Sequence, residues 1–156
     1  MPELKAGREL DALVAFHLFG WRWFQKQSYT GEYRCALYPP DDGLWIRWNF
    51  IGFEQIGEWP EEARRFSDWD RCGSRAGFRQ RPHLGWLPHY STDIAAVWQV
   101  LERLQQQGIL AELGAIDSRG WFASFTASER FSRMEADTAP LAICLAALCA
   151  VEVTHA

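Results

Sequence analysis

The apolar stretch DTAPLAICLAALCAV, residues 137–151, places the strongest constraint on how this chain can fold. After Asp137 it contains no charged side chain until Glu152. Asp137 or Thr138 can accept hydrogen bonds from the free N–H groups of a first helical turn, and Pro140 suits that turn because no donor is needed there. We therefore expect a helix that is apolar on nearly every side, and such a helix must be buried on more than one face.

Small side chains along this helix indicate close packing. Ala142, Ala146 and Ala150 recur every four residues and form a stripe along which another backbone can approach. The neighbour is either another layer of the same domain or a second subunit, and the second case predicts a homo-oligomer. A bilayer is the competing environment, but a membrane span takes about 20 apolar residues and this run is shorter. We expect no membrane segment here.

Length, charge and cysteine spacing narrow the class of protein. A chain of 156 residues suffices for one domain with a core of its own. A net charge of −4 makes nucleic acid an unlikely partner, because phosphate backbones attract summed Lys and Arg. The start shows no export signal, so we expect a cytoplasmic protein. Cys35, Cys72, Cys144 and Cys149 lack metal-ligand spacing, so we expect structural thiols and no metal.

Helical and strand patterns alternate along the chain. Apolar spacing predicts a helix over Glu9–Phe19 and another that ends at Gly108, with Ser91 or Thr92 as its N-cap. The buried stripe predicted for that second helix is Ile94, Val97, Trp98, Leu101 and Leu104. Strands are predicted over Trp21–Gln25, Tyr33–Tyr38, Leu44–Phe53, Ile109–Ile116 and Trp121–Thr126, and the last two form a hairpin.

This order of elements favours an α/β (α+β) fold. We expect an α/β/α sandwich with a mainly antiparallel sheet of about five strands and helices on both faces. We expect one domain over residues 1–156, with a long insert at about 57–88 before the middle helix and a short helix near Glu61–Phe66. After residue 126 we expect a polar loop that leads into the final helix.

The insert has a composition that suits ligand binding. Arg75, Arg79 and Arg81 offer guanidinium groups for phosphate, and aromatic rings in the same segment can stack on a base. The N-terminus of the next helix can also attract anions. The predicted ligand-binding residues are Arg75, Arg79, Arg81, Trp69, Phe78, Trp86, His89, Tyr90, Ser91 and Thr92. They favour a nucleotide-like small molecule, although the arginines can equally form surface ion pairs with neighbouring carboxylates.

Catalysis finds little support in the sequence. The candidates for a nucleophile or base are Cys72, His83, His89 and Asp93, and their spacing matches no catalytic motif. We therefore expect a binding protein that is not an enzyme and uses no cofactor. The alternative to nucleotide binding is a protein-interaction module, because Trp and Arg dominate binding hot spots and Trp69 and Trp86 are candidate anchors.

Three stretches together resemble a known family. They are AGRELDALVAFHLFGW near the start, HYSTDIAAVWQVLERL in the middle and EADTAPLAICLAALCAV at the end. In this order they resemble the phage ABA sandwich domain family, small proteins encoded by phages and prophages. The resemblance implies an α/β/α sandwich, oligomer formation and a place in the infected bacterial host, and it carries no enzymatic assignment. A phage source adds the hypothesis of a counter-defence sponge that sequesters a host immune signalling nucleotide.

Overall fold

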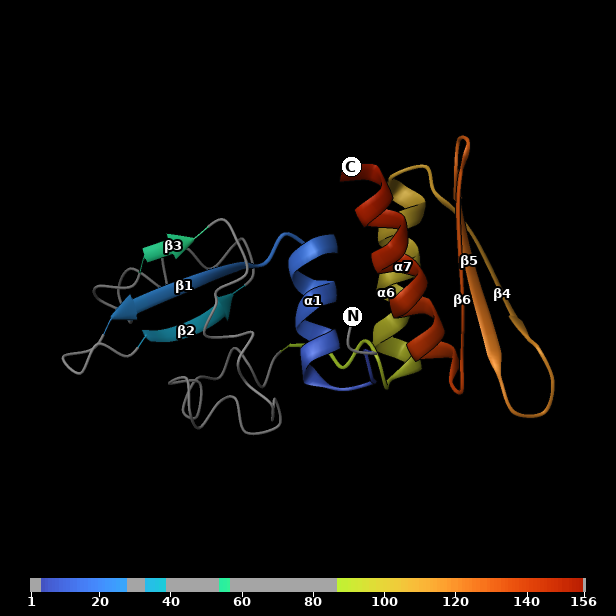
Figure 1. Ribbon diagram of the computed structural model, residues 1–156, viewed down its shortest axis with the longest axis horizontal. Helices are drawn as coiled ribbons and strands as arrows, with labels where there is room; N and C mark the ends of the chain where they lie inside the picture. The colour runs from blue at the N-terminus through green and yellow to red at the C-terminus, as the bar shows by residue number, and fades with distance from the viewer. Residues whose placement is uncertain (1–3, 28–32, 39–53, 57–86, 156) are drawn as a thin grey trace. The chain divides into compact units, whose positions relative to one another are not determined.

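The computed structural model describes residues 4–27, 33–38, 54–56 and 87–155, drawn in colour in Figure 1. The chain divides into two compact units. Unit 1 combines residues 1–19 with residues 88–156, and unit 2 is formed by residues 20–87 between them. The single domain that we expected over residues 1–156 stays a prediction.

Unit 2 contains a three-stranded antiparallel sheet. Its strands are β1 (Arg22–Gln27), β2 (Tyr33–Tyr38) and β3 (Glu54–Ile56), in the order β2-β1-β3. Trp23 of β1 pairs with Leu37 of β2, and both side chains are buried. The expected strand Leu44–Phe53 and the expected helix Glu61–Phe66 lie outside the described residues.

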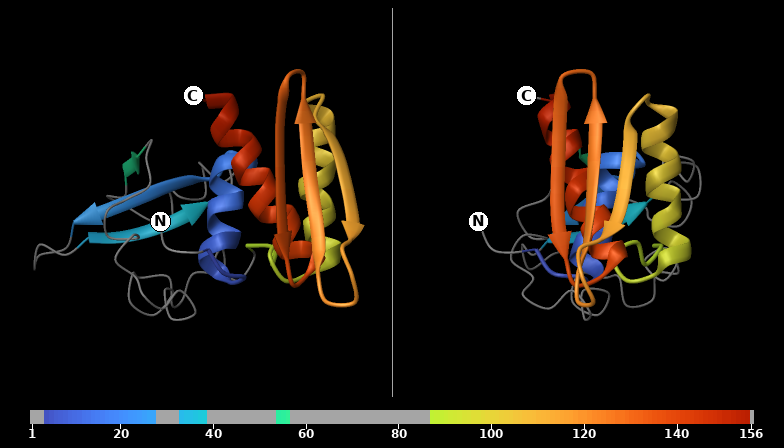
Figure 2. Two further views of the ribbon diagram at one scale, coloured as in Figure 1. Left: turned by 45° about the vertical axis from the view of Figure 1, so that its right-hand side comes forward. Right: turned by 90° about the vertical axis from the view of Figure 1, so that its right-hand side faces the viewer.

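Unit 1 consists of three helices and a second antiparallel sheet. The helices are α1 (Arg8–Leu18), α6 (Ile94–Gln106) and α7 (Ala139–His155). The strands are β4 (Leu110–Ala115), β5 (Trp121–Ala127) and β6 (Arg130–Ala136), in the order β4-β5-β6. Helices α6 and α7 lie side by side on one face of this sheet, and α1 packs against α7 (Figures 1 and 2).

The last helix is the centre of unit 1, as its apolar sequence predicts. Helix α7 contacts β5, β6, α6 and α1, and Ala142, Ile143 and Ala146 are fully buried. The stripe of small residues lets the sheet approach α7 closely. The Ser132 hydroxyl of β6 donates a 3.0 Å hydrogen bond to the Ala146 carbonyl. Neighbours within unit 1 therefore account for the burial of α7, and a second subunit is not needed to explain it.

A buried carboxylate joins the first helix to the turn that precedes α6. Asp11 is fully buried, and its carboxylate accepts hydrogen bonds from the Ser91 N–H at 2.8 Å and from Arg8 at 3.0 Å. The Ser91 hydroxyl in turn accepts a 2.9 Å hydrogen bond from the Gly7 N–H. These bonds join two segments that lie about 80 positions apart in sequence, so the YSTD stretch has a structural role.

The expected fold class is confirmed, and the arrangement differs in three details. The described strands form two antiparallel sheets of three rather than one sheet of about five. The helices that touch the β4-β5-β6 sheet lie on one face of it, whereas we expected helices on both faces. Strand β6 occupies a segment that we expected to be a loop. No helix in the described part of the chain is long and apolar enough to cross a membrane.

Candidate functional site

Only four of the ten predicted ligand-binding residues belong to the described part of the chain. Arg75, Arg79, Arg81, Trp69, Phe78 and Trp86 lie outside it, as do the catalytic candidates Cys72 and His83. The four described residues are His89, Tyr90, Ser91 and Thr92, which form the turn before α6. His89 and Thr92 are exposed, and the His89 carbonyl accepts hydrogen bonds from the N–H groups of Thr92 and Asp93.

Tyr90 and Ser91 face the interior of unit 1. The Tyr90 ring is 2 % exposed and stacks on Phe19 with a centroid separation of 5.1 Å. Burial, helped by the nearby carboxylate of Asp11, raises the pKa of the Tyr90 phenol far above its ordinary value. Ser91 is fully buried, with its N–H and hydroxyl in the bonds described above. Both residues hold unit 1 together, and ligand binding by them stays a prediction.

Asp93 has a structural role that we assigned to its neighbours. Its carboxylate accepts a 3.0 Å hydrogen bond from the Ala95 N–H, so Asp93 is the N-cap of α6, and the prediction of Ser91 or Thr92 was wrong. Ser91 does not cap the helix because its hydroxyl bonds to Gly7 and its N–H bonds to Asp11. A carboxylate at this position also interacts favourably with the positive end of the helix dipole.

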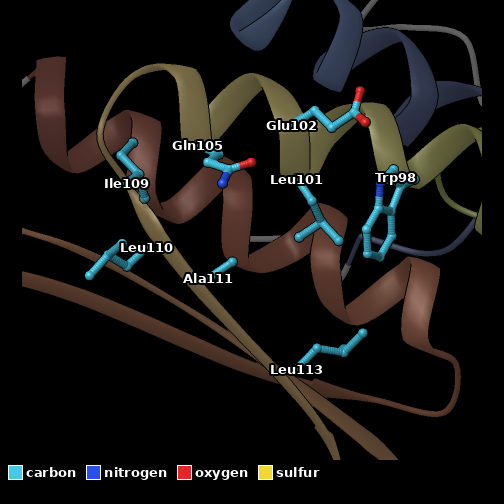
Figure 3. Close-up of a pocket in the computed structure, with 8 residues that line it drawn as sticks. All are labelled: Trp98, Leu101, Glu102, Gln105, Ile109, Leu110, Ala111 and Leu113. Carbon is cyan, nitrogen blue, oxygen red and sulfur yellow. The ribbon is translucent and has the colours of Figure 1, made fainter.

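The described residues form a groove between α6 and β4, which Figure 3 shows in close-up. Its volume is about 480 Å³, and it opens to solvent. It is lined by Trp98, Leu101, Glu102, Gln105, Ile109, Leu110, Ala111 and Leu113. Trp98 and Leu113 lie toward one end of the groove, and Ile109 lies toward the end where α6 turns into β4. An exposed apolar recess of this size is typical of a binding surface.

Helix α6 supplies one wall of the groove because it carries two apolar stripes. The first stripe, which includes Val97, Val100 and Leu104, is fully buried. The second stripe, Ile94, Trp98 and Leu101, follows the spacing i, i+4, i+7 and lies on another side of the helix. Ile94 is 54 % exposed and Trp98 is 56 % exposed.

Strand β4 supplies the other wall and lies at the edge of the sheet. It pairs with β5 on one side, and no described strand pairs with it on the other. Five of its six residues, with the sequence LAELGA, are exposed and the sixth is intermediate. Leu110 is 71 % exposed and Leu113 is 38 % exposed. The unpaired N–H and C=O groups of an apolar edge strand can bond to another strand. Natural proteins normally prevent such pairing with charged residues or with a helix or loop that covers the edge.

The charges near the groove are few. Glu102 is the one charged residue among those that line it. The neighbouring Arg103 does not face the groove, because its Nε donates a 3.1 Å hydrogen bond to the Leu18 carbonyl at the end of α1. The groove can therefore bind an apolar partner by burial of surface, and it contains no pair of titratable groups for acid–base chemistry.

On the opposite face of the sheet, the side chains of Phe122, Arg133 and Glu135 contact one another. The Arg133 guanidinium lies 4.6 Å from the centroid of the Phe122 ring and forms a 2.7 Å ion pair with Glu135. The Phe122 ring covers Gly114 of β4, where a β-carbon would come within 2.5 Å of the ring. These contacts hold β4 against β5 from the side away from the groove. The face of β4 that lines the groove stays accessible to a partner.

The described residues form no metal site, and the Cys144 thiol is inaccessible. No group of three His, Cys, Asp or Glu side chains there is arranged to hold a metal ion. Cys144 is fully buried in α7, and burial raises the pKa of its thiol well above the ordinary value. A protonated, inaccessible thiol is a poor nucleophile, in agreement with the structural role expected from its position in an apolar helix.

Sequence reasoning missed the groove because it placed the apolar residues of α6 on one stripe. Ile94 and Trp98 were grouped with Val97 and Leu104, although the two sets diverge around the helix. The sequence did contain a signal for the groove: the apolar surface of α6 is wider than packing against one sheet requires. A single buried stripe would not include both Trp98 and Val97.

The structure defines a mixed α/β protein with antiparallel sheets and an open apolar groove. The family model for the phage ABA sandwich domain matches residues 12–148, so the chain belongs to that family. A comparison with curated proteins finds no match. A crystal structure of a phage protein from Bacillus cereus ATCC 14579 is similar at 18 % sequence identity and a TM-score of 0.49, over 95 % of this chain and 93 % of that chain.

Proposed function

We propose that this phage-family protein acts by binding rather than by catalysis, and that the groove between α6 and β4 docks another polypeptide. The observation that supports this proposal is the exposure of Trp98, Leu110 and Leu113 around one recess, beside an edge of β4 that no described strand occupies. Trp is the residue type most enriched in binding hot spots, and a free edge can form main-chain hydrogen bonds with an added strand. The proposal keeps the interaction role expected from the sequence but moves its anchors to α6 and β4.

A photoreactive amino acid placed in the groove tests this function. Benzoylphenylalanine at Gln105, an exposed position in the groove lining, should form an adduct with one defined polypeptide. The matched control places the same group at Phe131 of β6, which is 64 % exposed and lies two strands away from β4. Mass spectrometry identifies the linked polypeptide and the residue attached. The proposal fails if no adduct forms or if Phe131 gives the same adduct.

The anchor residue provides a second test of the same proposal. The Trp98→Ala variant should reduce adduct formation at Gln105, because truncation of a central Trp typically weakens binding by about tenfold or more. Helix α6 should keep its structure in this variant, since the Trp98 side chain is 56 % exposed and Ala is a good helix former. Far-UV circular dichroism checks this point. Unchanged adduct yield in a folded variant would remove Trp98 from the site.

A second proposed function concerns a small molecule, and the composition of residues 57–86 supports it. Six arginines and several aromatic residues lie in this segment of a chain whose net charge is −4. Guanidinium groups that bind phosphate and rings that stack on a base suit a nucleotide-like ligand. We propose that this segment binds such a ligand without cleaving it, as expected of a sponge for a host immune signalling nucleotide.

Thermal shift measurements test the nucleotide proposal. A ligand at 100 times its dissociation constant adds about 2.7 kcal/mol to the free energy of unfolding, which shifts the melting temperature by several degrees. The shift should disappear in a variant with Arg75, Arg79 and Arg81 changed to Ser, and the ligand should be recovered unchanged after denaturation. A panel of linear and cyclic nucleotides without any shift, or recovery of a cleaved product, would refute the sponge.

A further inference from the structure

We propose that the polypeptide in the groove is a second copy of this chain, with the two β4 strands paired antiparallel across a two-fold axis. The inference rests on the proposed docking function and names its partner. Pairing of this kind would extend the described three-stranded sheet to six strands and bring the two α6 helices together on one face.

Most of the exposed large apolar side chains lie on β4 or beside it. Seven large apolar side chains are exposed among the described residues. Five of them belong to α6, to β4 or to the residue that follows β4: Ile94, Trp98, Leu110, Leu113 and Ile116. Leu113 lies on the face of β4 toward α6, and Leu110, which is opposite Thr126, lies on the other face. Two-fold pairing along β4 would bring apolar side chains together on both faces of the sheet, which a ligand confined to the groove cannot do.

The sequence of β4 is self-complementary in one register. Two-fold pairing that keeps the helices of both copies on the same face must be centred on a single residue, because side chains alternate between faces. A register centred on Leu113 places Leu113 opposite Leu113, Leu110 opposite Ile116, and Glu112 opposite Gly114. A register centred on Glu112 would oppose two carboxylates, which is unfavourable. The register at Leu113 therefore pairs apolar residues with each other and separates the like charges.

Helix α6 fits the same axis. The chain turns from α6 into β4 over Gln107–Ile109, with the Ile109 N–H bonded to the Leu104 carbonyl, so the two elements run antiparallel. With a rise of about 1.5 Å per residue in a helix and about 3.3 Å in a strand, the helix residue level with Leu113 is about nine positions before the turn. That position is Trp98, and Figure 3 shows Trp98 and Leu113 toward the same end of the groove.

Two copies related by an axis at Leu113 therefore bring their Trp98 rings together. Antiparallel helices centred on Trp98 place Ile94 of one copy near Glu102 of the other and keep the two Glu102 carboxylates apart. Each Trp98 then fills space in the opposing groove, and the paired β4 strands satisfy the backbone groups of the free edge. The symmetric contact is closed, so it forms a dimer rather than an open chain of subunits.

Charge substitutions at the axis test the register directly, because Leu113 opposes itself. The unsubstituted chain, of 18.0 kDa, should sediment as a dimer at micromolar concentration. The Leu113→Lys and Leu113→Glu variants should each be monomeric, since each places two like charges face to face. An equimolar mixture of the two variants should restore the dimer, because Lys then meets Glu. Phe131→Lys, on the opposite face of β6 and 64 % exposed, is the control that should remain dimeric.

A further variant keeps the test valid if the Leu113 variants do not fold. Leu110→Lys changes a side chain that is 71 % exposed and should leave the circular dichroism spectrum unchanged while it raises the dimer dissociation constant at least tenfold. A monomeric wild-type protein, or dimers that persist in all three variants, would overturn the inference. If the protein is monomeric and the Gln105 adduct contains a different polypeptide, the docking function stands and self-pairing fails. If no adduct forms, both fail.

Discussion

Asp11 is a carboxylate that is fully buried in unit 1. An ionised carboxylate is costly to bury unless it is hydrogen-bonded, and here the Ser91 N–H and the Arg8 guanidinium supply the bonds. This arrangement joins α1 to the turn before α6 and leaves Ser91 without a free donor at its N–H. A motif that a sequence search would assign to ligand binding is thus used to assemble the helices of unit 1.

Removal of this carboxylate should destabilise the protein strongly. The Asp11→Ala variant leaves the buried Ser91 N–H without its acceptor and Arg8 without its ion pair, so we expect a loss of about 3 kcal/mol in the free energy of unfolding. Urea denaturation of the wild type and the variant measures this loss. The matched control is Asp93→Ala, an exposed helix cap that should cost about 1 kcal/mol. Equal losses in the two variants would contradict the assigned role of Asp11.

The buried phenol of Tyr90 predicts a loss of stability in alkaline solution. Its pKa is raised in the folded state, mainly by burial and secondarily by Asp11 and Cys144. A raised pKa stabilises the fold fully below the ordinary value of about 10, and this stabilisation is lost as the pH rises above that value. The loss amounts to about 1.4 kcal/mol per pH unit for one group. The buried Cys144 thiol acts in the same direction from about pH 9 upward.

The Tyr90→Phe variant separates the phenol from the thiol. It keeps the ring that stacks on Phe19 and removes the titrating hydroxyl, so its free energy of unfolding should fall less steeply than that of the wild type above pH 10. Urea denaturation at pH 8, 9, 10 and 11 provides the two curves. Parallel curves above pH 10 would show that Tyr90 does not titrate with a raised pKa.

At the scale of the elements, the contact between Gly114 and Phe122 determines how β4 holds to β5. The Phe122 ring lies over Gly114, and the Arg133 guanidinium lies against the ring. An edge strand gains apolar cover in this way from an aromatic residue on its neighbour. The arrangement explains how β4 remains attached to the sheet although the residue opposite Phe122 has no side chain.

The Gly114→Ala variant should lose stability because its methyl group would collide with the ring. A β-carbon at this position comes within 2.5 Å of Phe122 Cε1, and such overpacking typically costs about 1 to 3 kcal/mol. The double variant Gly114→Ala with Phe122→Leu should recover at least about 1 kcal/mol relative to the sum of the single changes. Additive losses in thermal or urea denaturation would show that the ring does not hold this position.

Elements with a regular spacing of apolar residues were predictable from the sequence. Elements that mix apolar and charged residues without such a spacing were not. The three helices follow from apolar spacing and from signals such as Thr138, which bonds to the Leu141 N–H at the start of α7. Strand β6 was missed because RFSRMEA carries three charged residues and no β-branched one, while its pairing with β5 supplies the stability. The groove was missed because only the placement of β4 beside α6 shows that Trp98 stays exposed.

At the scale of the whole molecule, unit 2 is an insertion into unit 1. The chain leaves unit 1 after Phe19 and returns to it at Pro88. The chain leaves at the end of α1 and returns beside its start, because Gly7 bonds to Ser91, although the Phe19 ring still reaches Tyr90 and stacks on it at 5.1 Å. Unit 1 can therefore close without unit 2 where a linker runs the length of α1 between these two positions.

This arrangement predicts that unit 1 folds without unit 2. A variant in which a Gly-Ser linker that runs the length of α1 replaces residues 20–87 should retain the three helices and the β4-β5-β6 sheet, because the buried core of α7 and the Asp11 bonds lie entirely within unit 1. We expect a helix-rich circular dichroism spectrum and a cooperative thermal transition. Asp11→Ala in this shortened protein is the control and should abolish or sharply lower the transition.

The shortened protein also separates the two proposed functions. The groove between α6 and β4 belongs to unit 1, so docking and the β4 dimer should survive the deletion, while nucleotide binding should be lost with residues 57–86. Sedimentation and thermal shift measure the two properties on the same sample. A shortened protein that is unfolded would show that the units share one core and would restore the single-domain interpretation of the chain. A folded but monomeric product would instead mean that unit 2 is needed for assembly.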